Sequence, residues 1–575
     1  MNIDVFQQYF NRHSFEKKFQ LSILLNFIFL ISYLIFGHIK YEVSDDFIMQ
    51  LLVSGGYTGK PSPEIVFMNI CIGYILSFLY TYIPFINWYF WMQIVTIFTS
   101  CIMICYILLK FKDTFCMRFL VFIFLCFFTP DLYLLIQFTK TSTIALLAGC
   151  ITFIYYLKDS KNKYFIVGSL FFLLGLSIRK QCINIIVPYF VLMILSYIFI
   201  NREYIISIQI KKILMILIII IAELSFLNIT NSLYKNTHSN YQKYAEYNSM
   251  RSKVLDYPYY QYSDNADKLS NIGINENDYL NLIHWNFIDT EFFDVEKLNQ
   301  VYEILDDYRE SNPLGKKNSI IQLFNQEYWF YIGVLGCIVI FVIGIYKNKK
   351  YIFFSSIAII GTGIVLFLYA YMGRLVYRVE FSTFLSLAMY LLFLQSFLEE
   401  IRKIKKEGLL IFVSICLILM TSLYRGNTEN AFRNMFFSSK NITDKYSSQF
   451  NKDNIHNELK TEFQTHPEYL YFLGFQTMTQ VYYLNYSPFD SARNIDFKNS
   501  VYISGIETNH PQWKENLSNW SIDNPAKGLL RDNVYLVENI DYEIIYDFLK
   551  NHYGNEIKMT LYKELNGFKI WKFTR

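Results

Sequence analysis

Long apolar segments recur along most of this chain, and they constrain its fold more than any other feature. A helix needs about 20 mostly apolar residues to cross a bilayer. Runs of about that length recur between Leu21 and Tyr424, and charged residues make up only 17% of the chain. The expected spans are 21–37, 88–109, 118–136, 141–157, 164–178, 182–201, 212–228, 327–346, 351–371, 377–397 and 408–424. The sequence therefore predicts a polytopic α-helical membrane protein with about eleven transmembrane helices.

Basic residues predict the orientation of these spans, because Lys and Arg near span ends resist translocation and stay cytoplasmic. They gather in the N-terminal tail and in alternate loops. These loops lie near residues 110–118, 158–163, 202–212, 347–350 and 401–406. The pattern predicts a cytoplasmic N-terminus, and it places the two large polar segments and the C-terminus outside the cell membrane.

All the basic loops share one side only if the apolar segment 64–83 does not cross the membrane. On this segment a polar stripe recurs at helical spacing, formed by Asn69, Gly73, Ser77 and Tyr80. Such a stripe suits a helix lying in the outer membrane interface. The alternative is a true span with an external N-terminus, which leaves most basic loops outside.

The alternation of apolar and polar segments divides the chain into four predicted parts. Residues 1–228 form a membrane module with a first external loop at 38–87, and 229–326 form an external, helical loop domain. Residues 327–424 return to the membrane, and 425–575 form an external α/β domain, with strand-like sequences at 533–538, 557–565 and 567–573 and a helix at 539–554. His284 and Trp285 are expected on a buried helical face.

Charge and cysteine placement argue against nucleic-acid binding and against a fold stabilised by disulfides or by a Cys/His metal site. The net charge of +4 is small and its positive residues are scattered, so nucleic-acid binding is not expected. The nine cysteines all lie in or beside apolar segments, without C-x-x-C or Cys/His metal spacing. The large polar segments therefore carry no disulfide framework.

An acidic pair, Asp45 and Asp46, follows the first span in "YEVSDDF" and precedes a loop that contains Gly55, Gly56 and Gly59. A carboxylate near the membrane surface can act as a general base or bind a divalent cation such as Mg²⁺ or Mn²⁺. One of the pair can catalyse while the other tunes its pKa or shares the metal. The alternative is that both residues cap a helix or lie solvated in a loop.

Five cations are placed on the same outer side, where basic residues should be rare. They are Lys140, Arg179, Lys180, Arg374 and Arg378. Arginine binds phosphate oxygens through two parallel hydrogen bonds, so the group suits a lipid-linked phosphate. Arg374 and Arg378 are four residues apart, so a continuous helix would point both one way. Each cation alone can equally extend to lipid headgroups.

The acidic pair, the surface helix "EIVFMNICIGYILSFLYTYIP", the many later spans and the external C-terminal domain together resemble the GT-C glycosyltransferases. Within this superfamily the chain looks most like the bacterial O-antigen glucosyltransferase type. The resemblance implies transfer of a sugar from a polyprenyl-phosphate carrier to an envelope glycan. It assigns the catalytic or metal-binding carboxylate to Asp45 or Asp46. It assigns lipid-phosphate binding to basic residues of later loops. Where that type commonly has Gly-Arg, this chain has "GYTGKP" with Lys60.

Two other functions remain open. A polysaccharide polymerase or ligase would use a diphosphate-linked glycan, and external arginines such as Arg251 suit it almost as well. A flippase or transporter would need ionisable residues inside its spans, of which Glu223 is the clearest. The expected partners are a lipid-linked sugar donor, a glycan or glycolipid acceptor and membrane lipids.

Overall fold

The computed structural model describes residues 3–37, 39–200, 206–257, 261–311, 328–345, 349–397, 452–478, 487–490, 499–565 and 568–575. Within these residues, eight helices are long and apolar enough to cross a membrane. They are Lys17–Phe36, Trp88–Phe111, Phe115–Leu134, Phe138–Asp159, Lys180–Ile200, Gln209–Thr237, Lys349–Tyr371 and Tyr377–Ser396. The protein is thus mostly helical, with the apolar helices that a polytopic membrane protein requires. The predicted span 408–424 lies outside the described residues.

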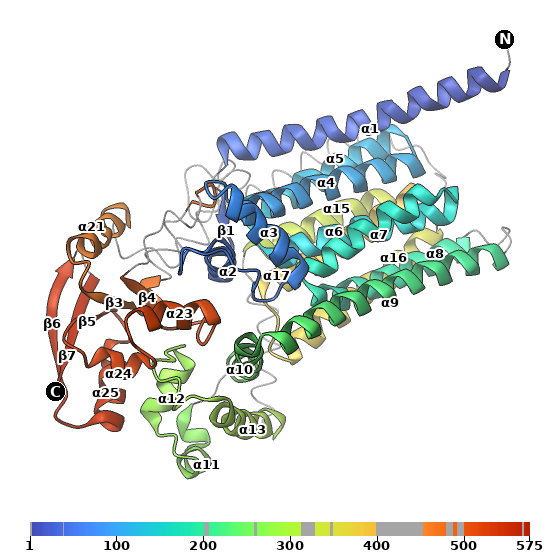
Figure 1. Ribbon diagram of the computed structural model, residues 1–575. Coiled ribbons are helices and arrows are strands. Elements are labelled where there is room, and N and C mark those ends of the chain that lie inside the picture. Colours follow the sequence, from blue (N-terminus) through green and yellow to red (C-terminus); the bar gives the residue numbers. More distant parts are fainter. Residues whose placement is uncertain are drawn as a thin grey trace.

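Most of these helices run side by side in one bundle (Figure 1). Its first part contains α1 (Ile3–Phe36), β1 (Lys40–Tyr41), α2 (Ser44–Ser54), α3 (Ile70–Tyr82), α4 (Trp88–Phe111), α5 (Phe115–Leu134), β2 (Leu135–Ile136), α6 (Phe138–Asp159), α7 (Asn162–Ile178), η1 (Lys180–Cys182), α8 (Ile183–Ile200) and α9 (Ile206–Thr237). Its second part contains α15 (Tyr328–Ile345), α16 (Lys349–Tyr371) and α17 (Tyr377–Phe397). Each predicted span from 21–37 to 377–397 coincides with one of these helices. Helices α6 and α17 are almost wholly buried, so they form the centre of the bundle.

Helix α3 is the segment that was expected not to cross. It has 13 residues, about 20 Å at the usual rise, against a hydrocarbon core of about 30 Å. Its polar stripe, however, faces the protein, because Asn69, Ser77 and Tyr80 are buried. The outer face instead exposes apolar and aromatic side chains such as Ile75 and Phe78. The polar stripe therefore packs α3 against the rest of the protein, and the apolar face of the helix points outward.

The polar segments form a second unit beside one end of the bundle (Figure 1). Its helical part contains α10 (Ser239–Leu255), η2 (Tyr262–Asp264), α11 (Ala266–Asn271), α12 (Glu276–Ile283) and α13 (Val295–Ser311). Its C-terminal part contains α21 (Lys452–Thr465), β3 (Leu470–Leu473), α22 (Phe475–Thr477), β4 (Ser500–Tyr502), α23 (Pro511–Asn519), α24 (Pro525–Leu529), β5 (Val534–Val537), α25 (Tyr542–Tyr553), β6 (Lys558–Leu565) and β7 (Phe568–Thr574). The predicted strands at 533–538, 557–565 and 567–573 and the helix at 539–554 are confirmed.

The C-terminal strands form one five-stranded sheet in the order β4-β3-β5-β7-β6. Strands β3, β4 and β5 are parallel, whereas β7 runs antiparallel to both β5 and β6. The carboxyl ends of the parallel strands therefore lie at one edge of the sheet. Ligands of open α/β sheets bind at this kind of edge.

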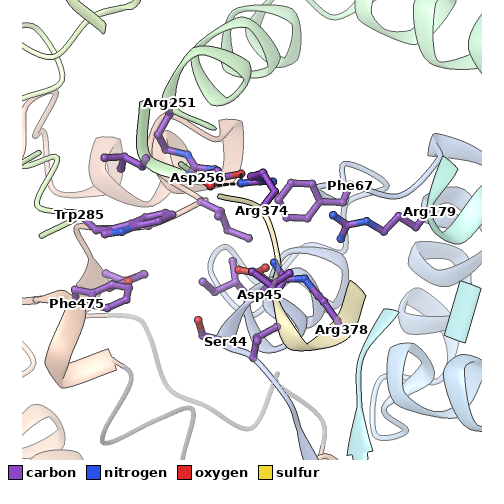
Figure 2. A pocket seen from close by; sticks show the side chains of 17 residues that line it. Ser44, Asp45, Phe67, Arg179, Arg251, Asp256, Trp285, Arg374, Arg378 and Phe475 are labelled. Atoms are coloured by element: carbon purple, nitrogen blue, oxygen red, sulfur yellow. Dashed lines mark hydrogen bonds and ion pairs between the residues drawn. The ribbon is translucent and has the colours of Figure 1, made fainter. Parts of the chain in front are cut away.

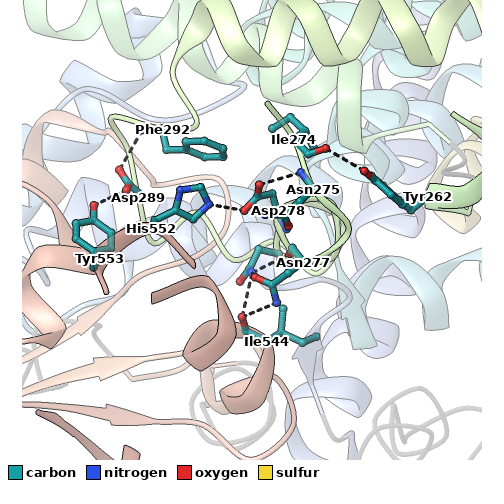
Figure 3. A network of polar contacts seen from close by, with 11 residues as sticks. Tyr262, Ile274, Asn275, Asn277, Asp278, Asp289, Phe292, Ile544, His552 and Tyr553 are labelled. Atoms are coloured by element: carbon teal, nitrogen blue, oxygen red, sulfur yellow. Dashed lines mark hydrogen bonds and ion pairs between the residues drawn. The ribbon is translucent and has the colours of Figure 1, made fainter. Parts of the chain in front are cut away.

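The two polar segments, predicted as separate domains, share one apolar core. Leu282 and Phe293 of the helical segment pack in the same cluster as Trp513 and Phe548 of the C-terminal segment. Figure 3 shows the polar seam between them, where His552 bonds Asp278 over 2.7 Å. The two polar segments thus complete one core between them.

Basic residues gather at the opposite end of the bundle. Lys18 of α1 pairs with Asp113 of the α4–α5 loop over 3.6 Å, and Arg118 binds the same carboxylate over 2.8 Å. Lys212 of α9 donates to the carbonyl of Leu157 near the end of α6 over 3.1 Å. The basic residues of the loops near 110–118 and 158–163 and at the start of α9 thus lie at one end, and the second unit lies at the other (Figure 1).

Candidate functional site

The first external loop begins with a short strand that fixes the acidic pair. Strand β1 pairs in parallel with β2, and the Glu42 amide donates to the Ile136 carbonyl over 3.0 Å. Helix α2 begins two residues later, so Asp45 and Asp46 lie in its first turn. Acidic side chains are favourable there because they face the positive end of the helix dipole. Neither carboxylate caps the helix, however, because the N-cap residue is Val43 and no side-chain cap hydrogen bond forms.

The two carboxylates nevertheless have different surroundings, because adjacent residues of a helix point about 100° apart. Asp45 lines a cavity of about 300 Å³ between the bundle and the second unit (Figure 2). Asp46 is wholly buried and does not line it. Its Oδ1 accepts from the Tyr89 hydroxyl over 2.8 Å and from the Gln93 amide over 3.0 Å. Asp46 therefore holds α2 against α4.

Three of the five predicted cations line the same cavity as Asp45. Arg179 follows the last residue of α7, and Arg374 and Arg378 come from the α16–α17 junction. Arg374 precedes α17 and Arg378 lies in its first turn, so the expected single helix carrying both is absent; Gly373, at φ +66°, turns the chain between the helices. The structure thus brings residues 45, 179, 374 and 378 together from distant parts of the sequence.

The other two cations lie elsewhere. Lys140 is 1% exposed and forms a buried cluster with Glu42 (2.7 Å) and Asp131 (3.1 Å). Lys180 is exposed and donates to Asn228 over 2.9 Å. Neither lines the cavity. Lys140 instead joins the β1 segment to α5 and α6, which is a structural role that its position in the sequence did not reveal.

The second unit contributes residues that sequence reasoning did not assign to the site. Arg251 of α10, Trp285, Phe475 and Tyr502 all line the cavity. Trp285 was expected on a buried helical face, but it follows α12 with φ at +66° and stacks on Phe475 at 6.1 Å. No local pattern marks these residues, since they become neighbours only when the two polar segments of the second unit pack together.

The cavity has two walls that carry cations against aromatic rings. On the bundle side the Arg179 guanidinium lies 4.6 Å from the Phe138 ring centroid and 5.6 Å from that of Phe67. On the other side the Arg251 guanidinium lies 4.9 Å from the Trp285 centroid. Phe67, like Trp285, has a positive φ, at +70°. Non-glycine residues held in this region store strain, and such residues cluster at functional sites.

The guanidinium groups differ in how they are paired. Arg374 is bound to Asp256, with Nη1 3.2 Å from Oδ2 (Figure 2). The side chains of Arg179 and Arg378 form no hydrogen bond or ion pair with the described residues. Burial lowers the pKa of Arg179, and the nearby charges of Arg378 and Arg374 lower it further, whereas Cys182 and Asp45 act in the opposite direction. Arginine stays charged under such conditions, so an anion between these groups would relieve their repulsion.

The charges that line the cavity come from four arginines and two aspartates, a net charge of +2. The described residues contain no group of three or more potential metal-ligating side chains. Asp45 lines the cavity and Asp46 does not, so the sharing of a divalent cation by the pair stays a prediction. The donor set around Asp45 fits an anion rather than Mg²⁺ or Mn²⁺.

Comparisons of the chain with models of protein families, with curated proteins and with solved structures found no match. The chemistry of this site is therefore inferred from its own residues.

Proposed function

We propose that this protein is a membrane glycosyltransferase. In this proposal it transfers a sugar from a polyprenyl-phosphate-linked donor to a glycan or glycolipid acceptor on the outer face of the membrane. The observation that carries the proposal is the cavity itself, in which Asp45 faces Arg179 and Arg378 at the end of a bundle of apolar helices. Such a place gives a lipid-linked anion access to the site from the bilayer.

Asp45 acts as the general base in the proposed reaction. An acceptor hydroxyl attacks the anomeric carbon, its proton passes to Asp45, and the bond between that carbon and the phosphate oxygen breaks. The leaving phosphate gains a negative charge as the bond breaks. Arg179, Arg374 and Arg378 stabilise that charge, and guanidinium groups fixed in advance do so without reorganisation.

The residues that line the cavity also favour a polymerase or ligase, but they do not favour a transporter. The net charge of +2 also favours a polymerase or ligase, because a diphosphate-linked glycan carries two negative charges and a phosphate-linked sugar carries one. Transport gains no such support: Glu223, the ionisable residue expected for it, accepts a hydrogen bond from Ser169 and does not line the cavity.

Replacement of Asp45 by Asn tests the proposal most directly. The change keeps the size of the side chain and removes its charge, so we expect turnover to fall by about 100-fold or more. The assay follows release of the polyprenyl carrier from radiolabelled lipid-linked sugars by the purified full chain. Asp113→Asn is the matched control, since Asp113 lies at the other end of the bundle.

Transfer by Asp45→Asn at the parent rate would refute the assignment of the base. The metal prediction is tested in the same assay, because a site with a base alone keeps its activity in EDTA, whereas loss of activity that Mg²⁺ or Mn²⁺ restores would assign a metal.

A further inference from the structure

Three polar atoms of the second unit are buried at the cavity without a hydrogen-bond partner among the described residues. They are Arg251 Nη1, Tyr502 Oη and Glu507 Oε2. Arg251 and Tyr502 are 1% exposed and Glu507 is 0% exposed. Buried polar groups in native proteins nearly always have a partner. Unpaired buried atoms also occur elsewhere among the described residues, but these three belong to residues that line or adjoin one cavity, where a ligand can supply the missing bonds.

Two of these residues line the cavity, and the third, Glu507, lies directly behind its lining. Arg251 and Tyr502 line it directly, and Glu507 follows Gly505 and Ile506, which also line it. A Cβ added to Gly505 would stand 3.0 Å from Tyr502 Oη and 3.1 Å from Glu507 Oε2. The hydroxyl and the carboxylate thus converge on one glycine, whose φ of +96° few other residues adopt.

Each of these side chains is fixed by its other atoms. Arg251 donates from Nε and Nη2 to Asn248 over 3.0 and 2.8 Å, which leaves Nη1 unused. Glu507 Oε1 accepts from the Tyr57 hydroxyl over 3.3 Å, which leaves Oε2 unused. Tyr502 is the last residue of β4, so its side chain stands at the carboxyl edge of the parallel strands. The wall is therefore rigid before any ligand binds.

The chemistry of the wall differs from that of the bundle side. Arg251 only donates hydrogen bonds, Tyr502 donates or accepts, and a carboxylate accepts. A phosphate offers acceptors alone and would be repelled by Glu507. A sugar hydroxyl both donates and accepts, so two neighbouring hydroxyls can satisfy all three groups. Burial raises the pKa of Glu507, and an uncharged ligand does not require that group to be ionised.

We propose that Arg251, Tyr502 and Glu507 form a saccharide subsite, which binds the hydroxyl groups of a sugar ring opposite the phosphate-binding arginines. This proposal rests on the proposed function and adds to it: the bundle side holds the phosphate and the second unit recognises the sugar. The two polar segments are then part of the substrate site, rather than a separate domain beside it.

Binding of simple sugars tests the subsite without any need for catalysis. The probes are the methyl glycosides of glucose, galactose, mannose and N-acetylglucosamine, with binding to the purified full chain measured by saturation-transfer NMR. Tyr502→Phe removes only an unpaired hydroxyl, so we expect an unchanged melting temperature and affinity lower by about 3- to 10-fold. Glu507→Gln should lower affinity by a similar factor of about 3- to 10-fold, since an amide nitrogen in the place of Oε2 cannot accept a hydrogen bond.

A tyrosine of the same sheet and a glutamate of the neighbouring helix α21 provide matched controls. Tyr471 of β3 donates to Glu462 over 3.1 Å, and both residues are buried away from the cavity. Tyr471→Phe and Glu462→Gln should therefore leave glycoside affinity unchanged. Equal losses in the controls, parent affinity in Tyr502→Phe and Glu507→Gln, or no glycoside binding by the parent would each overturn the subsite.

Kinetics then identify which sugar occupies the wall. A rise in KM for the acceptor alone assigns the acceptor ring, and a rise for the donor alone assigns the transferred sugar; both outcomes support the subsite. Tyr502-dependent glycoside binding without any sugar transfer would contradict the proposed function and keep the subsite. Sugar transfer that is unchanged by substitution of Tyr502 and Glu507 would contradict the subsite and keep the proposed function.

Discussion

Asp45 and Asp46 are neighbours in sequence, but only one of them faces the cavity. The sequence indicated a catalytic carboxylate at this pair without a basis for choosing between them. Helical geometry makes the choice, because α2 turns Asp45 outward and buries Asp46 against Tyr89 and Gln93. The same limit applies to Lys140: its charge was evident from the sequence, whereas its pairing with Glu42 depends on packing between distant elements.

Asp46 should make the stability of the protein fall as pH rises. Burial raises its pKa from 3.8 to about 7, against hydrogen bonds from Tyr89 and Gln93 that lower it. Between these values the folded state holds a proton that the unfolded state releases, so rising pH favours unfolding. Asp46→Asn removes this titration. We expect the melting temperature of Asp46→Asn minus that of the parent to increase from pH 4.5 to pH 8.

Asp113→Asn provides a control in the same pH scan, because its effect on the melting temperature should change with pH in the opposite direction. The hydrogen bond from Arg118 is the main cause that lowers the pKa of Asp113, so its contribution is present at neutral pH and lost as pH falls through the lowered value. A constant difference between Asp46→Asn and the parent across the scan would contradict the burial argument.

Substitutions of the cavity arginines should have different effects, depending on whether the arginine already forms an ion pair. Arg378 has no hydrogen-bond or ion-pair partner among the described residues, so Arg378→Gln should raise the KM for the donor by about 10-fold with an unchanged melting temperature. Arg378→Lys should restore only part of this, because an ammonium group cannot form two parallel bonds. Arg374→Gln should also lower the melting temperature, since it leaves Asp256 unpaired.

Steady-state kinetics with lipid-linked sugars and thermal unfolding of the same samples measure both effects. Arg118→Gln is the control, because it alters an ion pair at the other end of the bundle. Parent donor KM in Arg378→Gln would show that this arginine does not contact the phosphate.

At the scale of elements, periodicity predicted the structures with long or alternating patterns. The spans, helix α25 and strands β5, β6 and β7 were all recognisable from the sequence. Strands β3 and β4 were not predicted, although β5, which is equally short and buried and is parallel to β3, was recognised. The polar stripe of α3 was also recognised, but its packing against the protein was not, since a sequence does not say whether a polar face meets water or protein.

The seam between the two polar segments is held by reciprocal histidine–aspartate pairs, which should give it pH dependence. His284 of the helical segment lies 2.9 Å from Asp541, and His552 of the C-terminal segment lies 2.7 Å from Asp278 (Figure 3 shows the second pair). The hydrogen bond with Asp541 raises the pKa of His284 above 6.5. Its contribution is therefore fully present below about pH 6.5 and lost as pH rises through the raised value.

His284→Gln should accordingly lower the melting temperature more at pH 6 than at pH 8.5. The effect should be small, because the imidazole is 39% exposed to solvent. His238→Gln serves as the control, since His238 is exposed and lies outside the seam. An equal loss at both pH values would mean that the contact acts only through packing.

At the scale of the whole molecule, charge separates two ends of one bundle. The basic loops around Lys18 and Lys212 meet at one end, and the cavity with its second unit lies at the other. The positive-inside rule then predicts that the cavity faces outward. The existence of the bundle could be predicted from hydropathy. The cavity could not, because its walls come from segments that are distant in sequence and meet only in the folded chain.

Cysteine labelling tests this orientation in intact cells with a membrane-impermeant maleimide. Cysteines introduced at Ser239, Ser311 and Ser518, which are exposed residues of the second unit, should react without permeabilisation. A cysteine at Lys161, exposed between α6 and α7, should react only after permeabilisation. The parent chain, which has free cysteines of its own, sets the background. The reverse pattern would place the cavity in the cytoplasm, where Asp45 and Arg378 would meet the inner leaflet and an outward-facing lipid-linked donor could not reach them.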